Sequence, residues 1–103
     1  MNVMNIILTL VLPKSFEEDL VDQLLEHPEW VSGFTTVDVN GHGHSVAYQA
    51  SSEQVRGRVA RVQVEIAMQQ EHAQMLIEHL KQRMQSAEIA YWLTPMIEFG
   101  RFA

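Results

Sequence analysis

The chain has 103 residues, of which 47% are hydrophobic, and such a composition predicts one globular domain spanning residues 1–103. Its formal net charge of −6 argues against non-specific nucleic-acid binding, which needs a basic surface. The sequence contains no cysteine, which excludes disulfides, a thiolate nucleophile and cysteine-ligated metal sites and is consistent with a cytoplasmic protein.

The first segment, residues 3–12, is a nearly continuous apolar run that only Thr9 and Asn5 interrupt. Such a run predicts a strand that is covered on both faces. The segment lacks a basic leading stretch and a small-residue cleavage site, and it is too short to span a bilayer. We therefore expect neither a signal peptide nor direct membrane insertion.

A helix is predicted to follow from Ser15. Ser15 and Glu18 have the spacing of a capping box, in which both side chains bind amides at the helix start. Pro28 should end the helix, because the residue before a proline disfavours the α conformation. The apolar residues of this segment have helical spacing and are Phe16, Leu20, Val21, Leu24 and Leu25.

A second strand is expected from Gly33 through Val39. Gly41-His42-Gly43 should break it, because glycine tolerates positive φ and close approach to a ligand. The polar stretch 44–58 exceeds the usual hairpin length, and such loops are mostly functional or disordered. A third strand resumes at Val59. Its two sides alternate, with Ala60, Val62, Val64, Ile66 and Met68 on the apolar side and Arg61, Gln63 and Glu65 on the other.

A second helix is predicted from Gln70 to Met84, followed by a fourth strand over Ala87–Leu93 that Pro95 interrupts or confines to an edge. The helix has an apolar stripe formed by Ala73, Leu76, Ile77, Leu80 and Met84. Two right-handed strand-helix-strand units give an α+β, ferredoxin-like βαββαβ sandwich, a four-stranded antiparallel sheet with both helices on one face. We expect copies of the same chain to bury the other face.

Several segments together resemble the PII-like superfamily, the nitrogen-regulatory PII signalling proteins and their relatives. They are Gly33-Phe34-Thr35, Gly41-His42-Gly43, the third strand at residues 62–66 and the aromatic strand ending in Pro95. The resemblance implies a non-enzymatic signalling protein, a homotrimer with effector clefts between subunits, and a loop that contacts a partner. It is closest to a subfamily whose genes lie near heavy-metal efflux pumps. This implies a role in metal homeostasis and a transporter or efflux-system protein as the partner.

The same resemblance assigns two groups of site residues. The effector-binding group is Gly41, His42, Gly43, Arg61 and Arg101. The partner loop contributes His44, Tyr48, Glu53, Arg56 and Arg58. PII proteins also bind ATP or ADP through a glycine-rich segment with a lysine between the second helix and the fourth strand. Here that segment, residues 83–89, has neither glycine nor lysine, and so tight ATP binding is not expected.

A divalent metal ion is the other candidate ligand, because imidazole nitrogens of His42 and His44 could bind it. Two ordinary polar loop histidines are the simpler interpretation. A second histidine and methionine stripe, formed by His72, Met75 and His79, is interpreted as a solvated helix face. His27 is interpreted as a helix C-terminal residue that the dipole favours.

Three functions follow from these features. The first is a trimeric regulatory protein that binds a small effector and contacts a partner through residues 43–58. The alternative is a divalent-metal tolerance protein of the CutA type, and a weaker one is a dimeric ferredoxin-like enzyme. Catalysis has little support, because the sequence has no Ser/His/Asp arrangement and no H-E-x-x-H motif.

Overall fold

The computed structural model describes residues 3–43 and 59–103. The elements are, in chain order, β1 (Ile6–Pro13), the 3₁₀ helix η1 (Lys14–Phe16), α1 (Glu17–Leu25), β2 (Thr35–Gly41), β3 (Val59–Met68), α2 (Gln70–Arg83) and β4 (Ala90–Pro95). The predicted ferredoxin-like βαββαβ fold is confirmed. Neither of the two α-helices in the described residues is long and apolar enough to cross a membrane.

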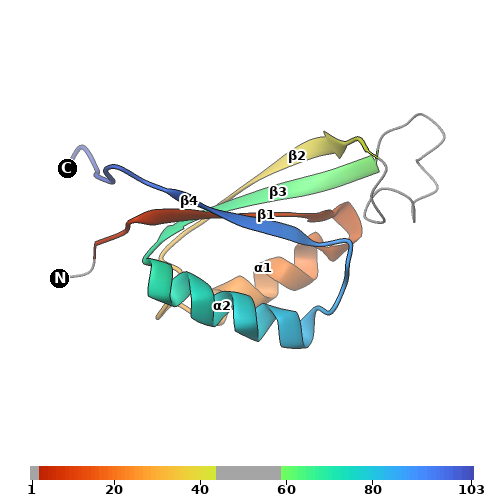
Figure 1. Ribbon diagram of the computed structural model, residues 1–103, viewed down its shortest axis with the longest axis horizontal. Helices are drawn as coiled ribbons and strands as arrows, with labels where there is room; N and C mark the ends of the chain where they lie inside the picture. The colour runs from red at the N-terminus through yellow and green to blue at the C-terminus, as the bar shows by residue number, and fades with distance from the viewer. Residues whose placement is uncertain (1–2, 44–58) are drawn as a thin grey trace.

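The four strands form one antiparallel sheet in the order β2-β3-β1-β4. The apolar β1 is central, pairing with β3 on one side and β4 on the other. Figure 1 shows both helices on the same side of the sheet, with the C-terminus and the Gly41 end of β2 at opposite ends of the molecule. The sheet therefore has one face covered by helices and one open face.

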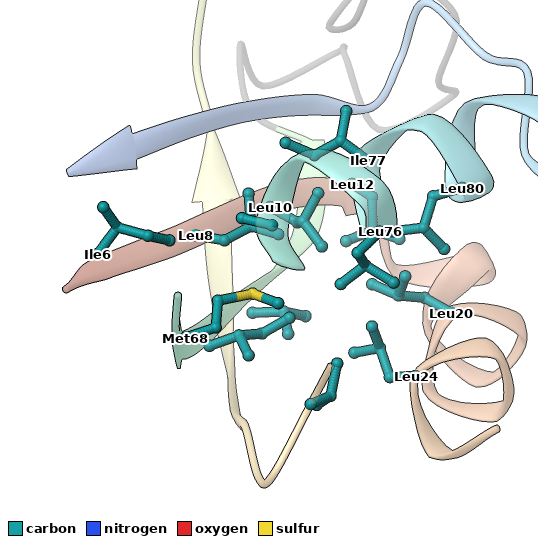
Figure 2. Packing of buried hydrophobic residues seen from close by; sticks show 14 of the residues in the cluster. Ile6, Leu8, Leu10, Leu12, Leu20, Leu24, Met68, Leu76, Ile77 and Leu80 are labelled. Atoms are coloured by element: carbon teal, nitrogen blue, oxygen red, sulfur yellow. The ribbon is translucent and has the colours of Figure 1, made fainter. Parts of the chain in front are cut away.

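The hydrophobic core lies between the sheet and the two helices. Figure 2 shows Leu20 of α1 and Leu76 of α2 gathered with Leu12 of β1 at the centre of this layer. The alternation predicted for the third strand is confirmed, because the buried core residues of β3 are Val62, Val64, Ile66 and Met68. The predicted stripe of α2 is confirmed too, with Ala73, Leu76, Ile77 and Leu80 buried and Met84 packed against the core.

The predicted capping box at Ser15 is wrong. Lys14–Phe16 form the 3₁₀ helix, α1 begins only at Glu17, and neither helix start has a side-chain capping hydrogen bond. Ser15 lies inside the 3₁₀ helix instead of at an N-cap position. The helix ends at Leu25, so the chain leaves the α conformation before Pro28, as expected.

The ends of the outer elements differ from prediction by a few residues. β1 begins at Ile6, not at residue 3, and α2 ends at Arg83 instead of Met84. β4 runs from Ala90 to Pro95, because the residues before it form a turn in which the amide of Ile89 donates to the carbonyl oxygen of Ser86. Pro95 is tolerated as the last residue of a strand at the sheet edge.

Candidate functional site

The open face of the sheet is largely apolar. Strand register places Ile7, Thr9, Val11, Val37, Val39, Ala67, Ala90, Trp92 and Thr94 on it, interspersed with Arg61, Gln63 and Glu65. Val37 is 54% exposed and Trp92 is 47% exposed. No helix of residues 3–43 and 59–103 covers this face (Figure 1). These two side chains lie on the two edge strands, and Ile7 and Val11 of β1 between them are half-buried, whereas Thr9 is buried. We take the partly exposed apolar side chains of this face as a candidate interaction surface.

The segment Gly41-His42-Gly43, called the hinge below, lies at the end of β2. Gly41 is the last residue of β2 and pairs with Val59 at the start of β3. Gly43 has a φ angle of 151°, a backbone conformation that residues other than glycine rarely adopt. His42, between the two glycines, is exposed. The predicted break of the strand at this position is therefore confirmed, because β2 ends at Gly41.

Arg61 lies close to the hinge but is buried. It pairs with Val39 and Pro13 on the neighbouring strands, and only 1% of its surface is exposed. Its Nη1 donates a hydrogen bond to the carbonyl oxygen of Glu88 at 3.3 Å. The guanidinium thus ties β3 to the connection between α2 and β4. Strand alternation alone placed Arg61 on the open face, and it gave no signal of this burial.

The connection between α2 and β4 is a compact turn. The amide of Glu88 donates to Oγ of Ser86 at 3.1 Å, and the amide of Ile89 donates to the Ser86 carbonyl oxygen at 3.3 Å. Both amides are therefore already paired within the turn. A phosphate group bound here would have to displace these bonds, since phosphate cradles use free backbone amides.

Arg101 lies at the other end of the sheet. It lines a pocket of about 340 Å³ together with Gly33, Thr35, Glu65 and other residues, and its guanidinium carbon is 5.5 Å from the ring centre of Phe99. Thr35 pairs with Glu65, whereas the Arg61 pairing lies further along the same two strands. At about 3.3 Å per residue, roughly 13 Å separates the two positions. One chain therefore does not bring Arg101 to the hinge and Arg61 (Figure 1).

No group of three metal-binding side chains occurs within the described parts of the chain. His44, Tyr48, Glu53, Arg56 and Arg58 of the predicted partner loop lie outside the described residues. Of the stripe on α2, Met75 is exposed and His72 is half-buried. The interpretation of His79 as part of a solvated face is wrong, because this half-buried ring contacts His27.

His27 and His79 form the centre of a polar cluster between α2 and the segment that follows α1. Their Nε2 atoms are 3.0 Å apart. Nδ1 of His27 donates to Oε2 of Glu29 at 2.9 Å, since a carboxylate only accepts. Nε of Arg83 donates to Nε2 of His79 at 2.8 Å. The ring of His27 stacks on Trp30, with ring centres 4.8 Å apart.

The cluster changes the acidity of two of its members. The hydrogen bond from His27 holds the pKa of the Glu29 carboxyl below its ordinary value. Burial lowers the pKa of His79, and the charge of Arg83 lowers it further. Sequence reasoning missed this cluster because His27 and His79 are 52 positions apart, and no periodicity connects a loop residue with a helix residue.

Comparisons with known proteins agree with the architecture. A DUF3240 family protein from Shewanella baltica OS155 has a TM-score of 0.78 at 21% identity, with 97% of this chain and 98% of that chain covered. CPII, a nitrogen regulatory PII-like protein from Thiomonas intermedia K12 bound to ADP, AMP and bicarbonate, gives 0.69 at 20% identity, covering 94% and 93%. A protein from Thermus thermophilus, assigned as a PII-like signaling protein, gives 0.64 at 15% identity, covering 93% and 91%.

At these identities the solved structures establish the fold, and the fold is that of PII-like proteins. A comparison with curated protein sequences finds no match. The family model described as "Protein of unknown function (DUF3240)" matches residues 3–103, and the chain therefore belongs to that family.

Proposed function

We propose that this chain is a PII-like regulatory protein that assembles as a homotrimer and binds a small anionic effector between subunits. The observation that carries the proposal is the open sheet, with the hinge and Arg61 at one end and Arg101 at the other. A site that contains both ends needs two chains. The apolar open face supplies the surface through which copies associate.

The hydrogen-bond donors around the proposed site favour a small anion over a nucleoside triphosphate. Arg101 is exposed and supplies a positive charge to the pocket that it lines. Arg61 is buried against Glu88, so an effector acts on it by opening the turn before β4. The paired amides of Glu88 and Ile89 argue against a tight triphosphate site. The Thiomonas protein was solved with ADP, AMP and bicarbonate, which makes these three the first ligands to test.

Signalling would proceed through the loop that starts after Gly43. An effector bound beside the hinge acts on the residues that follow it, and the partner protein contacts His44, Tyr48, Glu53, Arg56 and Arg58. A membrane transporter or efflux-system protein is the partner that we propose. None of the relatives named above is described as a metal-tolerance protein, so the alternative of a CutA-type function is not favoured.

Two measurements test the proposal. Light scattering should give three times the chain mass of 11.8 kDa, and a monomer at micromolar concentration would overturn the assembly. Calorimetry with bicarbonate, AMP, ADP and ATP should show binding of a small anion or of a nucleotide with few phosphates, and weak or absent binding of ATP.

The matched variants are Arg101→Gln and Lys81→Gln. Arg101→Gln should abolish anion binding while the oligomer persists. Lys81→Gln removes an exposed cation from the last turn of α2 and should leave binding unchanged. Equal affinity in the two variants would remove Arg101 from the site.

A further inference from the structure

The pair of imidazoles formed by His27 and His79 has the geometry of a metal site. We propose that the Nε2 atoms of His27 and His79 together bind one divalent transition-metal ion, Cu²⁺ or Ni²⁺ in preference to Zn²⁺. The site is formed within one chain, on the helical side of the sheet. It therefore does not depend on the trimer or on the effector cleft.

The distances between the two rings fit a shared ion. Imidazole binds such ions at about 2.0–2.1 Å, so two bonds at a right angle place the nitrogens about 2.9 Å apart, and tetrahedral bonds place them about 3.3 Å apart. The observed separation of 3.0 Å is nearer the right angle of tetragonal Cu²⁺ and Ni²⁺ sites. Rings that point at a common ion in this way have centres about 4.5 Å apart, and the observed value is 4.3 Å.

The other contacts of His27 hold its ring ready for a metal ion. Nδ1 donates to the Glu29 carboxylate, which places the proton on that nitrogen and leaves Nε2 as the basic one. Carboxylates in this position orient histidine ligands and raise their basicity. Stacking on Trp30 at an interplanar angle of 14° fixes the plane of the ring. Both the tautomer and the orientation are thus set before an ion arrives.

A metal ion would take the place of the proton that the two facing nitrogens share. The two nitrogens are at hydrogen-bond distance, 3.0 Å, so either a proton or a metal ion can lie between them. Arg83 already directs a charged donor at Nε2 of His79. Arg83 is the exposed last residue of α2, so its side chain can move away when a metal ion binds. Water completes the coordination, because the Glu29 side chain at the edge of the cluster is 55% exposed.

The direct test is calorimetric titration of the tag-free protein with CuCl₂ and with NiCl₂. Wild-type protein should bind one ion per chain. His27→Ala and His79→Ala should each lose this binding. The matched control is His72→Ala, which removes a half-buried histidine about two turns earlier on the same helix and should leave the affinity unchanged. Circular dichroism confirms that each variant is folded.

Two further variants should change the affinity in opposite directions. Glu29→Gln removes the carboxylate that orients His27 and should weaken binding by about 10-fold or more. Arg83→Gln removes the competing guanidinium and should strengthen binding. Neither residue is a ligand, so both variants test the mechanism even if a histidine variant fails to fold. Equal affinities in these two variants would overturn the assignment.

An optical measurement locates the bound ion. In a Trp92→Phe background, Trp30 is the only tryptophan, and it stacks on a proposed ligand. Cu²⁺ should quench its fluorescence in a saturable manner, and His79→Ala should abolish the quenching. A wild-type protein without saturable binding would refute the site. Binding that disappears in a His42→Ala, His44→Ala double variant but persists in His79→Ala would also refute it.

Discussion

The two faces of the sheet are built by alternate residues of the same strands, but they differ in how much of their surface is exposed to solvent. On the helix side, Leu8 of β1 and Ile66 of β3 pair with each other and are 0% exposed. On the open side, Val37 and Trp92 keep about half of their surface in water. Both faces carry many apolar residues, but the chain itself buries the helix side of the central strands β1 and β3 almost completely and the open side only in part, at residues such as Thr9 and Arg61.

This difference separates folding from assembly. The helix-side core supplies the hydrophobic free energy that keeps one chain folded. The open face contributes little to that core, and it is the surface that we propose for association with copies. A substitution on one face should therefore reduce the free energy of unfolding, and a substitution on the other face should change the mass.

The largest effect is expected on the helix side. Leu8→Ala removes a fully buried side chain and should reduce the free energy of unfolding by about 2–5 kcal/mol. Urea denaturation measures this loss. Val37→Ala on the open face is the comparison, and its effect on the chain's own stability should be much smaller. An equal reduction of the free energy of unfolding in both variants would contradict the proposed difference between the two faces.

The second expected effect is on assembly. Trp92→Glu places a charge on the open face, on the edge strand β4, and should reduce the particle mass from three chains to one, because burying an unpaired carboxylate is unfavourable. Circular dichroism should show that the fold persists. Met75→Glu is the matched control, since Met75 is 54% exposed, against 47% for Trp92, but lies on α2. Loss of the trimer in the control alone would move the interface to the helices.

A smaller effect is expected at Arg61, which lies on the open face by register but is buried. Arg61→Met leaves the carbonyl oxygen of Glu88 without this donor and should cost about 1–3 kcal/mol of stability. Hydrogen exchange should show faster opening of the amides of Glu88 and Ile89. Gln63→Met, two residues further on the same strand, should leave these amides protected.

The smallest effect is expected for the ion pair between Lys14 and Asp38. Asp38 lies on the helix face by register, but its side chain on the edge strand β2 is 73% exposed. Hydrogen bonds from Lys14 to Asp38 and to Glu17 raise the pKa of Lys14 above its ordinary value of 10.5. Folding therefore favours the protonated amine, and this contribution is complete below pH 10.5 and disappears as the pH rises through the folded pKa. Lys14→Met should lower the melting temperature slightly at about pH 8, and the difference should vanish at strongly alkaline pH.

The sequence by itself determined the order of the elements, the fold and the helix-side core. Each of these depends on neighbours in the chain: the alternation in β3 and the helical spacing of Leu76 and Leu80 are local patterns, and the glycine break at residues 41–43 is a local backbone preference. The predicted ends of the elements were less accurate, as at Ser15, because a 3₁₀ helix and an N-cap share the same residue types.

Only the tertiary structure decided which polar side chains meet. The buried Arg61 donates to a carbonyl oxygen 27 positions away, and His27 faces His79 across 52 positions. The structure also placed Arg101 at the far end of the sheet from the hinge, which is why the proposed effector site needs two chains. Long side chains act across several ångströms of folded chain, and the spacing of residues along a sequence does not encode those distances.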